Sequence, residues 1–253
     1  MSRQPMKILI NLFLILLALL LRLSPDVAAE PAAEPLSGDL YSKTTPAIIV
    51  IDPGHGGADE GVKGPDGSLE KTLMLELARK IRARLVPDYD ARLTRDDDYQ
   101  VALTDRTGLA NSIHASLMIS LHAGAGFTPR SDVTTVYLNS PARPRTLPET
   151  ESDDAPLPEW QWQHQQDRHQ KESQQLGDLL TEKLSAMPRT AKVVTASAHL
   201  VVLAGADLPA VLLEFGDLNG AAGEKRLSDP EWQQQCAGAI ASAVREFMPF
   251  QSQ

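Results

Sequence analysis

Two histidines and two glutamates stand where a folded chain could bring them together for metal chemistry. His55 follows an apolar, β-branched run and lies in a glycine-rich turn, where glycine lets the backbone bend sharply and lets a ligand come close. His122 likewise comes at the end of an apolar run, at 117–121, and small residues follow it. Ligands collect beyond the carboxyl ends of the strands in an open α/β sheet. We therefore expect both imidazoles to face one crevice.

Glu70 and Glu214 are the acidic partners of these histidines. Glu70 begins a long helical pattern after the flexible turn 64–67, so its carboxylate can turn back toward the crevice; a favourable interaction with the helix dipole is the alternative. Glu214 ends the apolar run 210–213, and a carboxylate so close to buried side chains needs a partner or a function. Two histidines and a glutamate are the ligands of a catalytic zinc site that keeps a fourth position for water, which predicts one Zn²⁺ per chain.

Strands and helices alternate along the chain in an order that would place these residues together. The helix expected first has apolar residues at every fourth position, which gives it one face to pack on a sheet. The pattern predicts an α/β fold: a single domain with a mostly parallel, twisted sheet flanked by helices and a zinc site at the carboxyl ends of strands. We predict strands at 47–51, 91–93, 117–121, 134–138, 201–203 and 211–214, and helices at 69–85, 101–113, around 176–184 and at 230–247.

Length and composition limit the classes of protein to which the chain can belong. Its 253 residues, 42% of them hydrophobic, can bury one substantial core. The formal net charge of -9 argues against a nucleic-acid-binding protein, which needs clustered Lys and Arg to neutralise phosphates. Cys236 is the only cysteine, so an intramolecular disulfide is excluded, and its helical spacing indicates a small core residue. We expect a monomer.

The first 45 residues have the pattern of an export signal followed by a tether. Arg3 and Lys7 flank an apolar run at 8–21, and small residues follow at 27–29, which predicts a signal peptide over 1–29. Residues 30–45 mix Pro, Ala, Glu and Ser without periodicity and predict a flexible linker. The catalytic domain is then expected over 46–250. Export to a periplasm is the expectation, with secretion or a signal anchor as alternatives.

A glycine-rich motif surrounds the first histidine: the run IDPGHGG at 51–57, followed by Asp59, Gly61, Glu70 and Lys71. This motif looks like the opening signature of the zinc-dependent N-acetylmuramoyl-L-alanine amidases of the Amidase_3 family. Similar motifs follow in the family's order, and together they cover about residues 46–248: LTR at 93–95, Leu103 with Arg106, AN at 110–111, ISLHA at 119–123 and LPAVLLE at 208–214.

Position by position, the resemblance implies His55, Glu70 and His122 as zinc ligands and Glu214 as the catalytic carboxylate. It implies peptidoglycan as the substrate and hydrolysis of the amide between N-acetylmuramic acid and the L-alanine of the stem peptide, for cell-wall remodelling or daughter-cell separation. Zinc would lower the pKa of its bound water toward ~7, and Glu214 would pass the proton of that water to the leaving amine.

Asp52 and Asn111 are expected to brace the turn and the ligands from behind, a support that metal sites commonly need. The chain departs from the family pattern at Gly124, where Asn is usual, and at 215–220, which reads FGDLNG in place of a Gly-Phe-Leu-Ser-Asn type of sequence. Neither departure removes a proposed ligand, but both affect the shape of the crevice.

Residues 141–171 interrupt the pattern with a stretch rich in Pro, Glu, Gln and Asp, which predicts an insertion that is helical at its end. Amidases that separate daughter cells carry a regulatory segment here, which blocks the zinc site until an activator moves it. The resemblance therefore predicts autoinhibition, a protein activator, and Glu149, Glu151 and Glu159 as regulatory candidates. A low-complexity surface loop is the alternative.

Three other functions remain open at this point. The first is an exported zinc peptidase that cuts within the stem peptide. The second is a binding module that holds peptidoglycan without cutting it, which the retention of all four expected positions argues against. The third is a structural tether between membrane and wall, which would leave the paired histidines and glutamates unexplained.

Overall fold

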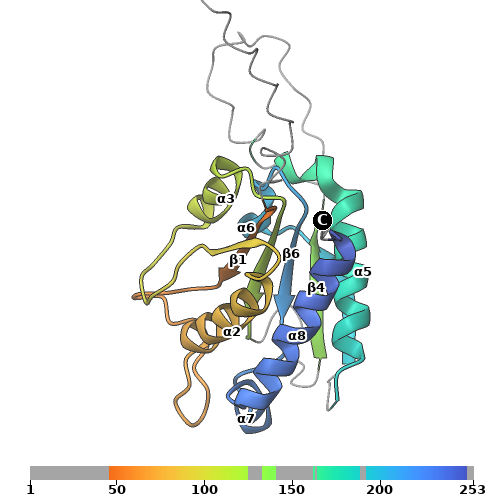
Figure 1. Cartoon of the computed structure of the whole chain (residues 1–253). Helices are drawn as coiled ribbons and strands as arrows, with labels where there is room; N and C mark the ends of the chain where they lie inside the picture. The colour runs from red at the N-terminus through yellow and green to blue at the C-terminus, as the bar shows by residue number, and fades with distance from the viewer. Residues whose placement is uncertain (1–45, 125–132, 141–161, 163, 189–191, 250–253) are drawn as a thin grey trace, which may run out of the picture. The chain divides into compact units, whose positions relative to one another are not determined.

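The computed structural model describes residues 46–124, 133–140, 162, 164–188 and 192–249. They belong to one compact unit, Pro46–Gln253. Within this described part of the chain, no helix has both the length and the apolar character needed to cross a membrane. The elements, several of them labelled in Figure 1, are β1 Ile48–Pro53, α2 Glu70–Leu85, β2 Asp90–Leu93, α3 Leu103–Ser112, β3 Leu117–His122, β4 Val133–Asn139, the 3₁₀ helix η1 Gln165–His169, α5 Gln170–Ser185, β5 Lys192–Ala198, α6 Val201–Ala204, β6 Ala210–Glu214, α7 Ala221–Leu227 and α8 Pro230–Phe247.

The six strands form one mixed sheet in the order β2-β1-β3-β6-β4-β5. The first four of these strands are parallel to one another, β4 is antiparallel to β6, and β5 is parallel to β4. The carboxyl ends of β1, β3 and β6 therefore lie at the same edge of the sheet. The predicted α/β fold with a mostly parallel sheet is confirmed.

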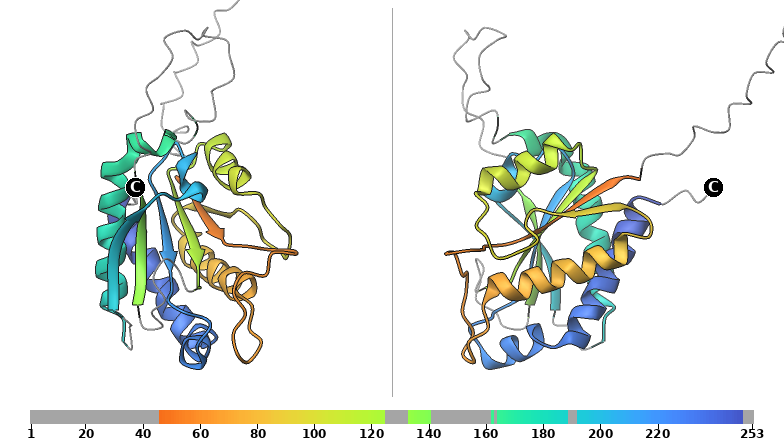
Figure 2. Two further views of the ribbon diagram at one scale, coloured as in Figure 1. Left: turned by 180° about the vertical axis from the view of Figure 1, so that it is seen from behind. Right: turned by 60° about the vertical axis from the view of Figure 1, so that its left-hand side comes forward.

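Successive residues of the strands face two different layers of helices. Ile51 and Ile119 pack with residues of α2, α5 and α8, whereas Val50 and Met118 pack with residues of α3 and α6. Figures 1 and 2 show α2, α5 and α8 together on one side of the strands and α3 and α6 on the other. Coverage on both faces explains why the central strands read as continuous apolar runs.

Helix α8 has the bounds that the sequence predicts. It begins at Pro230, which suits the first helical position because its backbone lacks an N–H. The side chain of Asp229 caps the helix by accepting a hydrogen bond from the N–H of Glu231 at 2.9 Å. Its apolar stripe, which includes Cys236, lies in the larger core as expected.

The predicted strand at 201–203 is wrong, because Val201–Ala204 form the short helix α6. Leu203 and Ala204 donate their N–H groups to the carbonyl of Leu200, and the apolar side chains pack on the sheet. A short apolar run does not distinguish a buried helix from a strand by periodicity. Strand β5 and helix α7 were not predicted, since β5 is half-exposed and rich in small residues and α7 has only seven residues.

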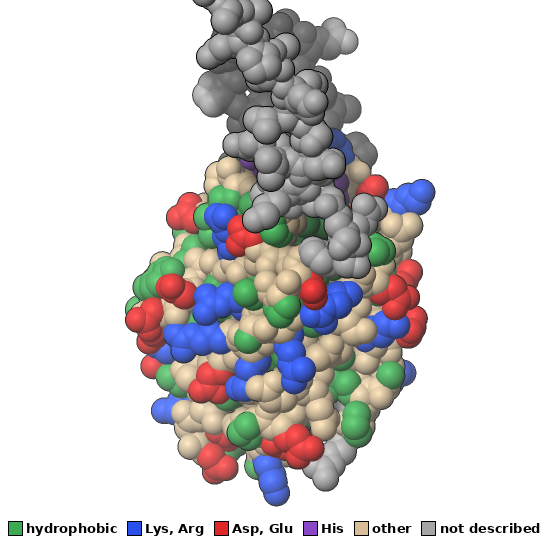
Figure 3. Space-filling view, viewed as in Figure 1, with side chains coloured by type: hydrophobic (Ala, Val, Ile, Leu, Met, Phe, Trp, Pro, Cys, Tyr) green, Lys and Arg blue, Asp and Glu red, His purple; other side chains and the backbone are tan. Residues whose placement is uncertain are grey.

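The face that carries α2 and α8 is notably basic for an acidic protein. Figure 3 shows Lys and Arg side chains spread across its middle. A shallow groove between the two helices is lined by Arg79, Lys80 and Arg84, together with Glu76 and Gln234. The net negative charge is thus unevenly distributed over the surface.

Candidate active site

His55 lies in a left-handed turn immediately after β1. Its φ is 61°, and Gly56 and Gly57 follow with φ values of 128° and 60°. A positive φ is uncommon for residues other than glycine, although histidine adopts it more readily than most, and contacts from the surroundings hold this conformation. The N–H of Gly54 donates to the carbonyl of Leu121 at 2.9 Å, which fixes the start of the turn to β3.

Three cations bind the carbonyl groups of this turn. Arg95, which is fully buried, donates to the carbonyls of residues 53 and 54. Arg106 donates to the carbonyls of residues 53 and 55, and Lys71 donates to that of residue 57 at 2.7 Å. These contacts stabilise the turn that presents His55. Spacing alone did not predict this shared role, because the cations come from three separate segments.

Asp52 is fully buried at the end of β1 and accepts three hydrogen bonds. The donors are Thr94 Oγ1 at 2.5 Å, Arg106 Nη1 at 2.7 Å and Ser120 Oγ at 2.7 Å. A carboxylate with this many charged and polar donors is well compensated for its burial. Asp52 thus joins β1 to β3 and α3 directly behind the His55 turn.

His55, Glu70 and His122 come together as one potential metal-binding group. Glu70 Oε1 lies 3.1 Å from His55 Nε2 and 3.1 Å from His122 Nδ1. One ligand atom from each of the three side chains lies within 4.8 Å of the others. The two imidazoles meet edge to face, with ring centroids 5.0 Å apart. Two imidazole nitrogens and a carboxylate oxygen are a donor set that zinc prefers.

Two glycines leave the space that this group occupies. A Cβ added to Gly54 would lie 2.4 Å from Cε1 of His122, and a Cβ on Gly61 would lie 2.6 Å from Oε2 of Glu70 and 2.7 Å from Cδ2 of His55. Gly61 also has a φ of 66°, which disfavours a side chain there. The three side chains can therefore approach one another only because both positions lack a Cβ.

The carboxylate of Glu70 binds groups outside α2 and does not only interact with the dipole of that helix. Its Oε1 accepts the N–H of Ala123 at 2.9 Å and its Oε2 accepts the N–H of Val62 at 3.0 Å, both from outside the helix. Burial opposes ionisation of Glu70, but hydrogen bonds from His122 and His55 hold its pKa well below the usual range. The carboxylate is therefore ionised and directed at both imidazoles.

His55 is oriented by a second carboxylate. Its Nδ1 lies 2.9 Å from Oδ2 of Asp59, which leaves Nε2 directed at Glu70. Burial lowers the pKa of His55, but the hydrogen bonds and charges of Glu70 and Asp59 outweigh it and raise that pKa above the usual value. A carboxylate on the remote ring nitrogen is a common support for a metal-binding histidine.

Glu214 lies beside the group at the end of β6, and its Oε1 accepts the N–H of Gly124. Burial raises the pKa of Glu214 to about 7 and the charge of Glu70 acts in the same direction, against the opposing effects of the Gly124 N–H and of His122 and His55. A carboxylate with a pKa near neutrality can both accept and donate a proton.

Gly124 separates the two carboxylates. A Cβ at this position would lie 3.6 Å from Glu70 Oε2 and 3.7 Å from Glu214 Oε1, so both side chains flank the same residue. The same Cβ would lie 3.0 Å from Cγ2 of Val62. The Asn that is usual in the family would therefore need Val62 to move.

Asn111 contacts the turn between α6 and β6. Its Nδ2 donates to the carbonyl of Gly205 at 2.8 Å, and its Oδ1 accepts the N–H of Asp207 at 2.9 Å. Trp162, from the insertion, packs on the same turn, because a Cβ on Gly205 would lie 2.1 Å from the indole ring. The regulatory candidates Glu149, Glu151 and Glu159 lie outside the described residues.

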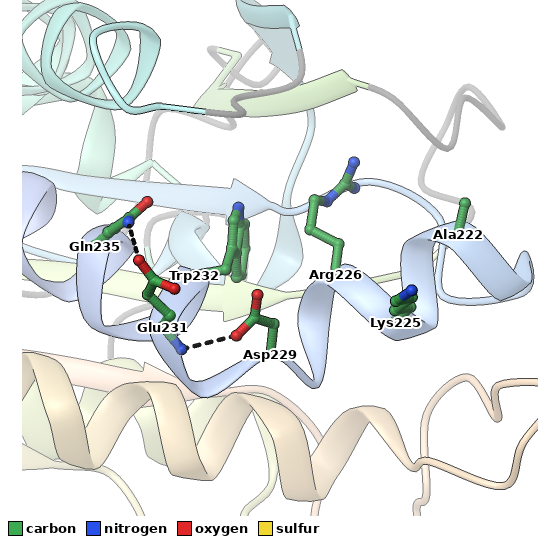
Figure 4. Close-up of a pocket in the computed structure, with 7 residues that line it drawn as sticks. All are labelled: Ala222, Lys225, Arg226, Asp229, Glu231, Trp232 and Gln235. Atoms are coloured by element: carbon green, nitrogen blue, oxygen red, sulfur yellow. Dashed lines mark hydrogen bonds between the residues drawn. The ribbon is translucent and has the colours of Figure 1, made fainter.

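A separate cavity of about 270 Å³ lies along α7 and α8. Figure 4 shows Trp232 and Arg226 directed toward β6, with Glu231 and Gln235 along α8. The Arg226 guanidinium lies 5.9 Å from the centroid of the Trp232 ring. None of the four residues of the candidate site lines this cavity.

An α/β domain with two histidines, a glutamate and a further carboxylate at the carboxyl ends of its strands has the features of a metal-dependent hydrolase. Comparison with protein families identifies which one. The family described as N-acetylmuramoyl-L-alanine amidase (Amidase_3) matches residues 49–246. The chain belongs to this family of hydrolases.

Curated relatives agree with this assignment. The chain is 30% identical to the N-acetylmuramoyl-L-alanine amidase AmiA of Salmonella typhimurium over 88% of its own length and 84% of that protein. It is 28% identical to AmiC of Neisseria meningitidis, with 90% of this chain aligned. The chain spans only 59% of the length of that AmiC.

Solved structures agree as well. The catalytic domain of CwlV, an N-acetylmuramoyl-L-alanine amidase from Bacillus (Paenibacillus) polymyxa var. colistinus, matches with a TM-score of 0.64 and 25% identity, over 81% of this chain and 99% of that one. AmiC2 of Nostoc punctiforme matches with a TM-score of 0.62 and 27% identity, over 80% and 97% of the two chains.

Proposed function

We propose that this chain is an exported, zinc-dependent amidase that hydrolyses the bond between N-acetylmuramic acid and the L-alanine of peptidoglycan stem peptides. The observation that carries the proposal is the meeting of His55, Glu70 and His122 next to Glu214. Membership of the amidase family supplies the substrate class.

The donor set suits a zinc ion. His55 Nε2, His122 Nδ1 and Glu70 Oε1 would hold it, and the missing Cβ atoms at Gly54 and Gly61 keep the space for these side chains. A zinc ion held by three protein ligands acidifies a water and polarises a carbonyl group. Asp59 and the cation-bound turn would keep His55 in place through the reaction.

Glu214 would carry the proton transfers. Its position at the end of β6, opposite His122, suits a base that takes a proton from the attacking water and then returns it to the nitrogen of the leaving L-alanine. The N–H of Gly124 holds one of its oxygens, which leaves the other oxygen for this task. Loss of this base should reduce turnover without removing the metal ligands.

The proposed zinc dependence is tested by metal content and restoration. The purified protein should contain one zinc ion per chain, lose peptidoglycan hydrolysis on treatment with a chelator, and regain hydrolysis when zinc is added. The His122→Ala variant should not regain it, whereas His114→Ala, which replaces an exposed histidine, should behave as the wild type. Hydrolysis by the chelated enzyme at the wild-type rate would contradict the proposal.

The zinc peptidase and the binding module remain the rival functions. A peptidase acting within the stem peptide would leave part of that peptide on the glycan, whereas the amidase leaves glycan with free lactyl groups. A binding module would retain peptidoglycan and release nothing. The products of the reaction therefore separate all three.

We further propose that the insertion restrains the site until a protein activator moves it. The described end of the insertion is part of the packed domain, because Gln166 is fully buried and donates to Ser173 Oγ at 2.7 Å. A deletion that tests the insertion should therefore end before this residue. Deletion of 143–159 removes none of the residues that make this contact and retains Trp162. The truncated enzyme should be more active than the full chain; equal activity would count against autoinhibition.

The place of action is also a proposal. It rests on the export pattern of residues 1–29, which lie outside the described residues. Fusion of these residues to a reporter enzyme that folds only outside the cytoplasm should give reporter activity, and Leu→Arg changes within 8–21 should abolish it.

A further inference from the structure

Glu224 is a buried carboxylate that the proposed reaction does not use. It lies in α7 and is only 2% exposed. Its Oε2 accepts the N–H of Asp66 at 2.7 Å, and its Oε1 accepts the N–H of Ser68 at 2.8 Å. These N–H groups lower the pKa of Glu224, so the carboxylate is held in its charged form. Glu224 therefore binds the backbone of a loop more than 150 residues away in sequence.

The loop that Glu224 binds, residues 62–69, closes on itself. The N–H of Gly64 donates to the carbonyl of Ser68 at 2.8 Å, and residues 63 and 69 form an antiparallel bridge. The carboxylate fits closely against it, because a Cβ on Gly64 would lie 2.4 Å from Cδ of Glu224. The N–H groups of Asp66 and Ser68, together with the space left by the missing Cβ of Gly64, thus bind the side chain of Glu224.

The other end of the same loop holds Glu70. The N–H of Val62 donates to Glu70 Oε2 at 3.0 Å, and the N–H of Glu70 donates to the carbonyl of Val62 at 2.9 Å. Helix α2 has no side-chain cap at Leu69, so these loop contacts hold its first turn. The loop is the connection between the carboxylate of α7 and the carboxylate of the candidate zinc site.

We propose that Glu224 is a positioning residue that fixes the loop 62–69 and, through Val62, the carboxylate of Glu70 for metal binding. The inference rests on the proposed zinc site. It assigns a function to α7 beyond packing, because this helix supplies the anion that the loop needs for two of its N–H groups. Loss of a group that hydrogen-bonds a metal ligand typically changes metal affinity by ~10 to 100-fold, and Val62, on which Glu224 acts through the loop, is such a group.

The test compares Glu224→Gln with Glu231→Gln in the full-length protein. Both variants lose one negative charge, but Glu231 is exposed on α8, where its Oε1 accepts a hydrogen bond from Gln235 of the same helix. Zinc affinity is measured by competition with a chromophoric chelator, and amide hydrogen exchange of residues 62, 66 and 68 is measured in the metal-free protein. We expect Glu224→Gln to bind zinc ~10 to 100-fold more weakly and to exchange these amides faster, with no change in Glu231→Gln.

A second variant protects the test against a failure of Glu224→Gln to fold. Gly64→Ala keeps the carboxylate but adds a methyl group 2.4 Å from Cδ of Glu224, which must move away, so it should weaken zinc binding in the same way. With Co²⁺ in place of zinc, both variants should show an altered visible absorption spectrum, which a change in overall stability alone would not produce. Wild-type zinc affinity in both variants, with or without faster exchange, would overturn the inference. Failure of the wild type itself to bind zinc would instead contradict the proposed site.

Discussion

His122 and Glu214 are direct neighbours across the parallel ladder of β3 and β6, at the last residue of each strand. The N–H of Phe215 then donates to the carbonyl of His122 at 2.9 Å, so the pairing extends past both side chains. A proposed metal ligand and the proposed base are thus held by the backbone of adjacent strands. Their separation does not depend on a mobile loop.

Replacement of Glu214 by Gln should separate catalysis from metal binding. The amide has nearly the same shape but cannot take a proton, so peptidoglycan hydrolysis should fall by ~10² to 10⁴-fold. Zinc content should stay at the wild-type level, because the three ligands are unchanged. A variant that keeps more than a tenth of wild-type turnover would exclude Glu214 as the base.

Replacement of Gly54 by Ala should remove zinc binding although no ligand is changed. The new methyl group would lie 2.4 Å from the imidazole of His122, which must move away. Gly108→Ala is the matched control, because nothing lies within 4 Å of a Cβ there and the site is inside α3. Isothermal titration with zinc checks both variants. The control should bind zinc normally and gain up to ~1 kcal/mol of stability.

Replacement of Asp52 by Ala should unfold the protein at lower denaturant concentration. The change leaves Arg106 buried without its carboxylate, and breaking a buried ion pair in this way costs about 3–5 kcal/mol. Asp105→Asn, an exposed change in the first turn of α3, should cost less than ~1 kcal/mol. Urea unfolding of the metal-free proteins measures both. Equal midpoints for the two variants would show that Asp52 does not brace the site.

The raised pKa of Glu214 predicts a pH dependence of stability in the metal-free protein. Because its folded pKa of about 7 lies above the ordinary 4.5, the folded state keeps a proton that the unfolded state has lost between these values. The free energy of unfolding should therefore fall as pH rises from about 4.5 to about 7, relative to Glu214→Gln. Urea midpoints of both proteins at pH 5 and pH 7 measure this difference, and a constant difference would contradict the shift.

Much of the fold follows from the sequence because the central strands are buried on both faces. Their apolar runs have strong local patterns, and their ends place His55, His122 and Glu214 at one edge under the general rule for parallel sheets. Helix α8 has the predicted bounds, and the structure shows that Asp229 and Pro230 mark its start. The convergence of these three side chains thus depends on features that are local in sequence.

The supports of the site could not be found in this way. Arg95 and Lys71 act through backbone carbonyl groups, and Glu224 acts through backbone N–H groups, so no pairing of side-chain types marks their partners. The error at 201–203 has a similar cause, because the packing of a short apolar run on the sheet decides its conformation.

The identity of the bond that the protein cuts in peptidoglycan distinguishes the proposed amidase from its rivals. Purified peptidoglycan is incubated with the protein, with its 143–159 deletion variant and with Glu214→Gln, each with zinc or with chelator, and the soluble products are identified by mass spectrometry. We expect zinc-dependent release of intact stem peptides that begin with L-alanine, from the wild type or the deletion variant and not from Glu214→Gln. Fragments cut within the stem peptide would contradict the proposed amidase activity, and so would the absence of a zinc-dependent product from both the wild type and the deletion variant.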